Sequence, residues 1–208
     1  KPQILKPVCE GLVDEVQTKQ PLIISIAAGP RIDDIDVWLG GGLSVVRVMP
    51  NQPALIDQGV SALFANDQTN DERCEQAEKI MTAVGHAVWL DSESNMDAVT
   101  AVSGTGPSYF YLLIDIMIQS AMKFGIDADT ARTLAVETAR GATALAAAET
   151  ESMSSLIDRV RSPGGTTTAA FEFLDQVDAR GIFATAIDEA EKRASELAKL
   201  AASAQKDL

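Results

Sequence analysis

The sequence predicts an α/β fold over its first ninety residues, followed by a segment built of helices. Up to Leu90, short apolar or β-branched runs alternate with stretches whose apolar residues recur at helical spacing, as in an α/β sheet. After Leu90 the strand pattern stops and helical spacing continues. We therefore expect two domains, at residues 1–91 and 92–208.

The expected strands are continuous runs of apolar residues. They cover residues 22–26, 43–48, 60–64 and 87–90. The first run is apolar except for Ser25, which suits a strand buried on both faces of a sheet. The second is rich in β-branched residues, which favour strands. The helices expected among these strands cover residues 8–16, 31–39 and 71–84.

Capping residues and glycines divide the rest of the chain into helices. A helix is expected to begin near Ser92, within a run of residues that favour caps. Gly125 ends the helix over 109–124, and Asp127 caps the next. Asp127 begins a helix that runs to about residue 148, and the remaining expected helices cover 152–160, 166–177 and 182–202.

The helix over 109–124 is apolar nearly all round. Its polar positions, Asp115, Gln119 and Lys123, form one narrow stripe, so this helix must be buried on most sides. It offers more apolar surface than a monomer easily hides, which predicts an interface with another subunit.

The composition excludes several functions. With 30 acidic and 17 basic side chains the formal net charge is −13, and Lys and Arg do not cluster, so nucleic acid and anionic membranes are not expected partners. The most apolar stretch, 109–122, is too short to span a bilayer. We expect a cytoplasmic protein whose Cys9 and Cys74 are reduced thiols, and a structural role for His86, with no metal site.

The segment 162–168 reads Ser-Pro-Gly-Gly-Thr-Thr-Thr and precedes a run with helical spacing. The first turn of a helix has backbone N–H groups without internal acceptors and lies at the positive end of the helix dipole. Glycines let a ligand approach, and threonine hydroxyls add donors, so the segment suits a small carboxylate or phosphate. The alternative is an ordinary loop followed by a capped helix.

Four segments together resemble the pyrroline-5-carboxylate reductase family. They are residues 25–29 (Ser-Ile-Ala-Ala-Gly), 46–51 (Val-Arg-Val-Met-Pro-Asn), 97–109 (from Asp97 to Tyr109) and 162–175 (from Ser162 to Asp175). They occur in the family's order, and the match runs from Lys1 to about Leu200. The resemblance implies the second part of a Rossmann-like dinucleotide-binding domain, followed by an all-α domain that forms a homodimer, with higher assembly possible.

The resemblance also implies a reaction and a site. The family reduces 1-pyrroline-5-carboxylate, a cyclic imino acid, to proline with hydride from NADPH or NADH. The implied substrate-binding residues are Ser162, Gly164, Gly165, Thr166, Thr167 and Thr100. Thr167 is the implied catalytic residue, because its hydroxyl can reach the ring nitrogen. The implied cofactor-binding residues are Lys1, Pro2, Ala27, Ala28, Gly29 and Asn51.

The opening of the sequence predicts a fragment. In the resembled family a segment like Lys1-Pro2-Gln3 follows the fourth strand of the nucleotide domain, and no Gly-x-Gly-x-x-Gly occurs in this sequence. We therefore expect an inactive fragment whose first strand, 22–26, lacks the preceding strand of the domain as a neighbour on one side.

Two alternative functions remain open from the sequence. One is an enzyme like the β-hydroxyacid dehydrogenases, which need a lysine on the helix after a Gly-rich break, whereas residues 104–122 contain none. The other is a non-catalytic helical module that only dimerises.

Overall fold

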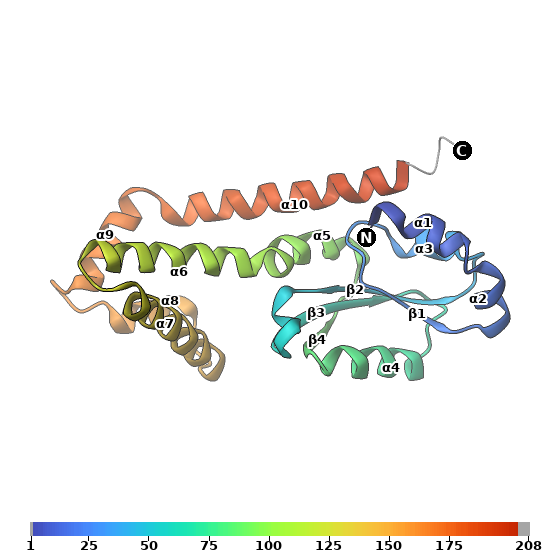
Figure 1. Ribbon diagram of the computed structural model, residues 1–208, viewed down its shortest axis with the longest axis horizontal. Coiled ribbons are helices and arrows are strands. Elements are labelled where there is room, and N and C mark those ends of the chain that lie inside the picture. The colour runs from blue at the N-terminus through green and yellow to red at the C-terminus, as the bar shows by residue number, and fades with distance from the viewer. Residues whose placement is uncertain (1, 204–208) are drawn as a thin grey trace. The chain divides into compact units, whose positions relative to one another are not determined.

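The computed structural model describes residues 2–203 and divides the chain into two compact units (Figure 1). The first unit comprises Lys1–Pro107 together with Ile187–Leu208, and the second comprises Ser108–Ala186. In this division residues 92–107 lie with the sheet, whereas the sequence placed them with the helices. The assignment of domains at 1–91 and 92–208 stays a prediction.

Four strands form one mixed sheet in the order β1-β2-β3-β4. The strands are β1 (Leu22–Ser25), β2 (Ser44–Pro50), β3 (Gly59–Ala65) and β4 (Gly85–Trp89). Each lies within about two residues of its expected position. β1 pairs with β2 and β3 with β4 in parallel, while β2 and β3 are antiparallel. The antiparallel pair needs only the short helix η1 (Gln52–Ile56) between its strands, whereas each parallel pair is joined through an α-helix.

Helices cover both faces of the sheet (Figure 1). On one face lie α1 (Pro2–Glu10), α2 (Val13–Lys19) and α3 (Ile32–Trp38), and on the other lies α4 (Asp71–Thr82). β2 separates the two cores because successive side chains point to opposite faces. Val45 packs in the cluster with α1 to α3, and Val46 packs in the cluster with α4.

Two expectations for this unit were wrong in detail. The helix expected over 8–16 is two helices, because the chain turns at Gly11 between α1 and α2. The strand expected to be buried on both faces is only half-buried at Leu22, Ile23 and Ile24. β1 is an edge strand of the described sheet, with β2 as its neighbour on one side, so its surface is covered less than that of a central strand.

The segment after β4 winds through three kinds of helix. Ser92 caps η2 (Glu93–Asn95), which leads into α5 (Met96–Val99) and a π-helical segment, η3 (Thr100–Gly104). The chain is therefore not interrupted before α6 but forms a widened helical turn. The Thr105 N–H donates to the Thr100 carbonyl oxygen at 2.8 Å, five residues back. Such turns are rare and occur frequently at functional sites.

The second unit consists of helices. Its elements are α6 (Gly106–Lys123), α7 (Ala128–Ala148), α8 (Met153–Val160) and α9 (Thr166–Gln176), with the start of α10 (Ala179–Ser203). Gly125, with φ +91°, ends the turn after α6 as expected. No helix in the described part of the chain combines the length and hydropathy needed to cross a membrane.

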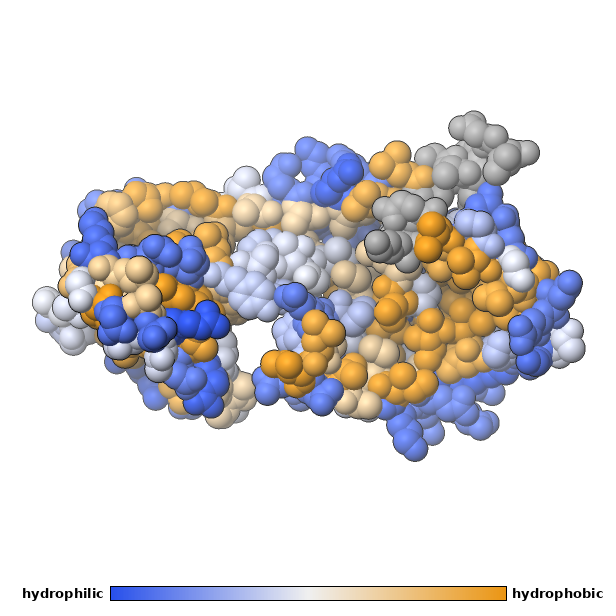
Figure 2. All heavy atoms as spheres, in the orientation of Figure 1, coloured by the Kyte–Doolittle hydropathy of each residue, from blue (hydrophilic) through white to orange (hydrophobic). Residues whose placement is uncertain are grey.

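Within one chain the second unit has almost no apolar core. Of its hydrophobic residues, all of which are described, Ala131 and Ala135 are buried. The expectation that α6 is buried on most sides is not met in the single chain, since Phe110 and Ile116 are about half exposed (53% and 50%). Figure 2 shows apolar surface in orange on the helical segments as well as over the sheet.

The cap of α7 predicts a pH dependence of stability. Asp127 accepts a hydrogen bond from the Thr130 N–H at 3.0 Å, and the Thr130 backbone and hydroxyl hydrogen bonds lower the pKa of Asp127. A lowered pKa in the folded state means that the stabilisation is present above the unfolded-state pKa and is lost as pH falls through the folded-state value. Asp127→Asn keeps a capping oxygen at every pH. Thermal melts from about pH 5 to about pH 3 should therefore show a smaller loss of Tm for Asp127→Asn than for the wild type. Equal losses would contradict this role.

Candidate functional site

The carboxyl ends of β1 and β2 lie at the same edge of the sheet because the two strands are parallel, with Ser25 opposite Arg47. After β1 the chain turns through residues 26–30. Ala27 and Gly29 are half-buried and Ala28 is exposed. Gly29 has φ +106°, a conformation that favours glycine. The turn thus presents small residues and accessible backbone where the sequence predicts the nicotinamide.

The end of β2 contacts the π-helical segment. The Asn51 Nδ2 donates to the Ser103 Oγ at 3.4 Å, and Asn51 Oδ1 accepts from the Val60 N–H at 2.9 Å. A Cβ added to Gly104 would lie 2.6 Å from Met49 Cε, so Met49 packs directly on this glycine. Asn51 therefore joins β2, β3 and η3 with both ends of its amide. Its role in cofactor binding stays a prediction.

Thr100 begins η3 and is half-buried. Its hydroxyl donates to the Met96 carbonyl oxygen at 2.8 Å, and its own carbonyl accepts from both the N–H and the hydroxyl of Thr105. The hydroxyl proton is thus engaged in a hydrogen bond within the helix. Toward a ligand, the Thr100 hydroxyl oxygen can therefore act only as a hydrogen-bond acceptor.

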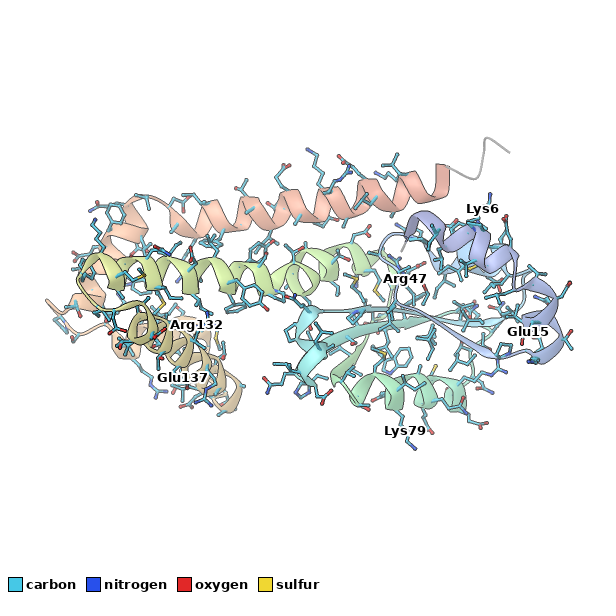
Figure 3. The ribbon with its side chains drawn as sticks, in the orientation of Figure 1. Lys6, Glu15, Arg47, Lys79, Arg132 and Glu137 are labelled. Atoms are coloured by element: carbon cyan, nitrogen blue, oxygen red, sulfur yellow. The ribbon has the colours of Figure 1, made fainter. Side chains whose placement is uncertain are left out.

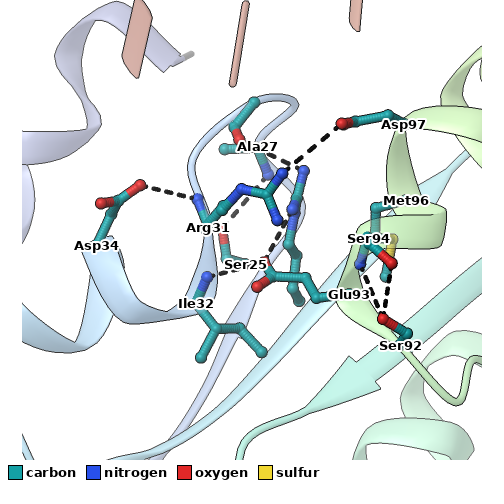
Figure 4. A network of polar contacts seen from close by, with 12 residues as sticks. Ser25, Ala27, Arg31, Ile32, Asp34, Ser92, Glu93, Ser94, Met96 and Asp97 are labelled. Carbon is teal, nitrogen blue, oxygen red and sulfur yellow. Dashed lines mark hydrogen bonds and ion pairs between the residues drawn. The ribbon is translucent and has the colours of Figure 1, made fainter. Parts of the chain in front are cut away.

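A network of buried charges lies beside the 26–30 turn (Figure 4). Arg47 Nη1 pairs with Glu93 Oε1 at 2.8 Å, and Nη2 donates to the Gly29 carbonyl at 3.4 Å. Glu93 Oε1 also accepts from the Ile32 N–H at 2.9 Å. The sequence reasoning missed this network, although an arginine inside the apolar strand Val-Val-Arg-Val-Met was a signal that a buried cation needs a partner.

The loop 162–168 closes on the carbonyl oxygen of Ser162. This oxygen accepts from the Gly165 N–H at 2.9 Å and from the Thr168 hydroxyl at 2.6 Å. Gly164 has φ +70°, and Gly165 precedes α9 as its N-cap without a side-chain cap. The loop therefore aims the first N–H groups of α9, an eleven-residue helix, away from the helix body.

The three threonines of this loop differ in what their hydroxyls do. Thr168 is used by the loop itself, because its hydroxyl donates to Ser162. The hydroxyls of Thr166 and Thr167 donate to no residue in the described part of the chain; Thr166 is exposed and Thr167 half-buried. The sequence alone did not separate Thr167 from Thr168, whereas the geometry leaves Thr167 available to a ligand.

The two arginines before the loop are already paired with carboxylates. Arg159 lies 3.1 Å from Glu149 and 3.5 Å from Glu151. Arg161 lies 3.8 Å from Asp175, and its guanidinium carbon is 5.1 Å from the ring centroid of Phe171. Their charges are largely balanced, so an anion at this loop would depend on backbone N–H groups and hydroxyls.

The two thiols are poor nucleophiles at neutral pH. Burial raises the pKa of Cys9, and the charge of Glu10 raises it further. Burial and the charge of Asp71 raise the pKa of Cys74 in the same way. Both groups therefore stay protonated thiols at neutral pH, and both are free cysteines in the structure. Among the described residues, no group of His, Cys, Asp and Glu side chains could hold a metal ion.

The remaining cofactor prediction falls at the start of the chain. Lys1 lies outside the described residues. Pro2 is the first residue of α1, and its side chain also lies outside the described part. The residues that are described at the sheet edge fit a nicotinamide ring, because the small side chains of Ala27, Ala28 and Gly29 leave room for a flat ring and carry no charge that would oppose it.

Comparison with known proteins agrees with this fold and these segments. The family model described as pyrroline-5-carboxylate reductase dimerisation matches residues 93–197. The chain is 44% identical to the pyrroline-5-carboxylate reductase of Pseudomonas aeruginosa, covering 96% of this chain and 72% of that protein. It is 36% identical to the enzyme of Pasteurella multocida, covering 96% of this chain and 73% of that protein.

Solved structures give the same result. The pyrroline-5-carboxylate reductase of Coxiella burnetii superimposes with a TM-score of 0.88 at 37% identity, over 95% of this chain and 73% of that one. The Plasmodium falciparum pyrroline carboxylate reductase, solved with NADP bound, gives a TM-score of 0.88 at 26% identity, over 95% of this chain and 79% of that one.

The fold and sheet edge thus define an oxidoreductase of the Rossmann-like class with a helical oligomerisation domain. The chain belongs to the pyrroline-5-carboxylate reductase family. Members of this family reduce 1-pyrroline-5-carboxylate to proline with NAD(P)H. The β-hydroxyacid dehydrogenase alternative is thereby set aside.

The closure of the 162–168 loop predicts the effect of one methyl group. A Cβ on Gly165 would lie 2.4 Å from Ser162 Oγ and 3.1 Å from the Ser162 carbonyl oxygen, so Gly165→Ala must displace Ser162. In an assay of the family's reaction, the KM for the imino acid should rise about tenfold or more while the KM for NAD(P)H stays unchanged. Gly11→Ala is the control, because its Cβ meets only ordinary contacts of 3.4 and 3.6 Å. Equal effects of the two variants would contradict the assignment.

Proposed function

We propose that the protein catalyses the reduction of 1-pyrroline-5-carboxylate to L-proline, and that the 162–168 loop holds the substrate carboxylate. The observation that carries this proposal is the free hydroxyl of Thr167 beside the open N–H groups at the start of α9, in a chain of this family. A helix N-terminus with nearby hydroxyls suits a carboxylate without any net positive charge. This matters in a chain whose formal charge is −13.

The chemistry needs three contributions. The carboxylate must be held, one face of the C=N bond must meet the hydride donor, and the ring nitrogen, which accepts a hydrogen bond through its lone pair, must take up a proton from solvent as the hydride arrives. NAD(P)H supplies the hydride, which adds to the imine carbon. Ser162, Gly164, Gly165 and Thr166 hold the carboxylate in this proposal, and the Thr167 hydroxyl donates a hydrogen bond at the ring nitrogen. Such positioning accounts for most of the catalysis the protein must provide.

The proposed contacts with the cofactor lie at the edge of the sheet where β1 and β2 end. The turn with Ala27, Ala28 and Gly29 receives the nicotinamide, with Lys1, Pro2 and Asn51 contributing to the cofactor site. Thr100 is a further proposed substrate-binding residue, which can offer its oxygen lone pairs. NADPH is the cofactor we favour over NADH, because the relative from Plasmodium falciparum was solved with NADP bound. A cytoplasmic location stays a prediction.

The role of Thr167 can be tested by two substitutions assayed in the family's reaction. Thr167→Ala should lower kcat about a hundredfold and leave the KM for NADPH near the wild-type value, as expected for one lost donor. Thr167→Ser should recover most of the rate, because the hydroxyl carries the effect. The measurement is the imine-dependent oxidation of NADPH, followed by its absorbance.

A control threonine separates this role from general damage. The Thr18 hydroxyl donates to the Asp14 carbonyl oxygen on an exposed helix, so Thr18→Ala should leave kcat unchanged. If Thr167→Ala and Thr167→Ser have the same rate, the hydroxyl has no role and the loop acts through its backbone alone. If the wild type does not oxidise NADPH with this substrate, the proposed function is wrong.

The chain carries an oligomerisation domain of its family, and we propose that it forms a homodimer through α6, with assembly of dimers as a further step. This proposal is supported by the observation that the second unit buries almost no apolar side chains within a single chain. A patch this apolar is normally covered by a partner. Leu113, Ile116 and Met117 are between 42% and 50% exposed in the single chain.

A charge placed on α6 should therefore prevent association. Ile116→Asp should give a monomer by light scattering at micromolar concentration, because a carboxylate would have to be buried without a partner. Leu55→Asp is the control, since Leu55 is 83% exposed in the first unit, outside the segment matched by the dimerisation model. A wild type that is monomeric, or an Ile116→Asp variant that stays a dimer, would contradict this interface.

A further inference from the structure

Arg47 is the most deeply buried charged side chain described at the sheet edge. Its side chain is 5% exposed, whereas the labelled Lys6, Glu15 and Lys79 lie on helices at the outside of the first unit (Figure 3). Burying a guanidinium away from water costs free energy unless the group is paired with an opposite charge and hydrogen-bonded. Its position in β2, directly opposite Ser25 of β1, places it under the turn that follows β1.

The guanidinium of Arg47 connects three segments that are distant in sequence. Through Nη2 it holds the Gly29 carbonyl, and through Nη1 it holds Glu93, just before α5 and η3. Glu93 in turn accepts a hydrogen bond from the Ile32 N–H at the start of α3, so the same carboxylate links Arg47 to this helix. A planar group with several fixed donors can make these contacts at once, whereas an ammonium is a point charge.

The neighbouring charges leave this network balanced. Arg31 lies 3.8 Å from Asp97, which is buried, and the Arg31 N–H donates to Asp34 at 3.2 Å. Arg31 and Arg47 thus face Glu93 and Asp97, two cations against two carboxylates. The guanidinium of Arg47 is therefore not left over as a site for an anion, and its remaining effect is on the backbone that it holds.

The 26–30 turn has few other hydrogen bonds, although Pro30 is fully buried and Gly29 lies against the backbone of α10 near Leu197. The Ala27 N–H donates to Ser25 Oγ at 3.4 Å, which is a contact within the turn and its own strand. Apart from this bond, the contact from Arg47 to Gly29 is the hydrogen bond that holds residues 26–30 in the described part of the chain. Arg47 thus supplies the hydrogen bond that ties this turn to β2.

We infer that Arg47 is a positioning residue for the dinucleotide: through the Gly29 carbonyl and Glu93, it holds the Ala27–Gly29 turn where the nicotinamide half of NADPH binds. This inference rests on the proposed function for the identity of the ligand. It predicts that loss of the planar, two-pronged guanidinium selectively weakens the binding of NADPH. The imino acid, which is held in the proposal by the 162–168 loop, should be affected little.

The test measures kcat and the two KM values in the family's reaction. Arg47→Lys keeps the charge beside Glu93 but loses the fork, and its KM for NADPH should rise about fivefold with the KM for the imine within twofold. Arg47→Met keeps the length and loses the charge, and its KM for NADPH should rise more than tenfold. Arg73→Met is the matched control, because Arg73 also donates to a backbone carbonyl, that of Gln20 at 2.7 Å, on the far side of the unit.

Hydrogen exchange on this chain gives a readout that needs no activity. In Arg47→Lys the peptide over 26–30 should exchange at least about threefold faster than in the wild type, while the peptide over 59–65 in β3 is unchanged. If Arg47→Met does not fold, Arg47→Lys decides the matter. A folded Arg47→Lys variant with a wild-type KM for NADPH overturns the inference, as does a KM for the imine that rises by the same factor. If the wild type has no reductase activity the proposed function fails, and unchanged exchange at 26–30 then overturns the positioning role as well.

Discussion

The parallel pairing of β1 with β2 is the constraint on which the first unit depends. Parallel strands end at the same edge, so the turn after β1 and the Met49–Pro50–Asn51 segment at the end of β2 become neighbours although about twenty residues separate them. The same register places Arg47 opposite Ser25. From there its guanidinium reaches Gly29 and Glu93, and so the sheet edge, α3 and the approach to η3 share one set of polar contacts.

The second unit is governed by a different constraint, the lack of a core. Its helices have good caps, such as Asp127 and Ser152, and sharp ends, such as Gly125, so each helix is well specified locally. Apolar residues of α6 nevertheless remain half exposed in one chain. Helices of this kind gain their stability mainly from packing, so the family's dimerisation domain and the apolar surface of α6 belong to the same explanation.

The loop at 162–168 shows how function is separated from local structure among similar residues. All three threonines begin the same helix, and all three could cap or bind. The loop uses Thr168 to close on Ser162, which frees Thr167. The positive φ of Gly164 and the contact of Gly165 with Ser162 shape this closure, which explains why both glycines are needed beside the hydroxyls.

The sequence by itself determined the elements and the family. Apolar runs, caps and glycines placed each strand within about two residues and nearly every helix correctly, because these signals act over a few neighbouring residues. Only the tertiary structure decided the mixed strand directions, the two helices over 2–19, the π-helical turn at η3 and the partners of Arg47. The turn at Gly11 and the π-helical bond from Thr105 to Thr100 are local details that apolar periodicity does not encode. The strand directions and the partners of Arg47 depend on contacts between residues far apart in the chain, and a periodic pattern carries no information about which distant carboxylate or carbonyl will lie beside a buried guanidinium.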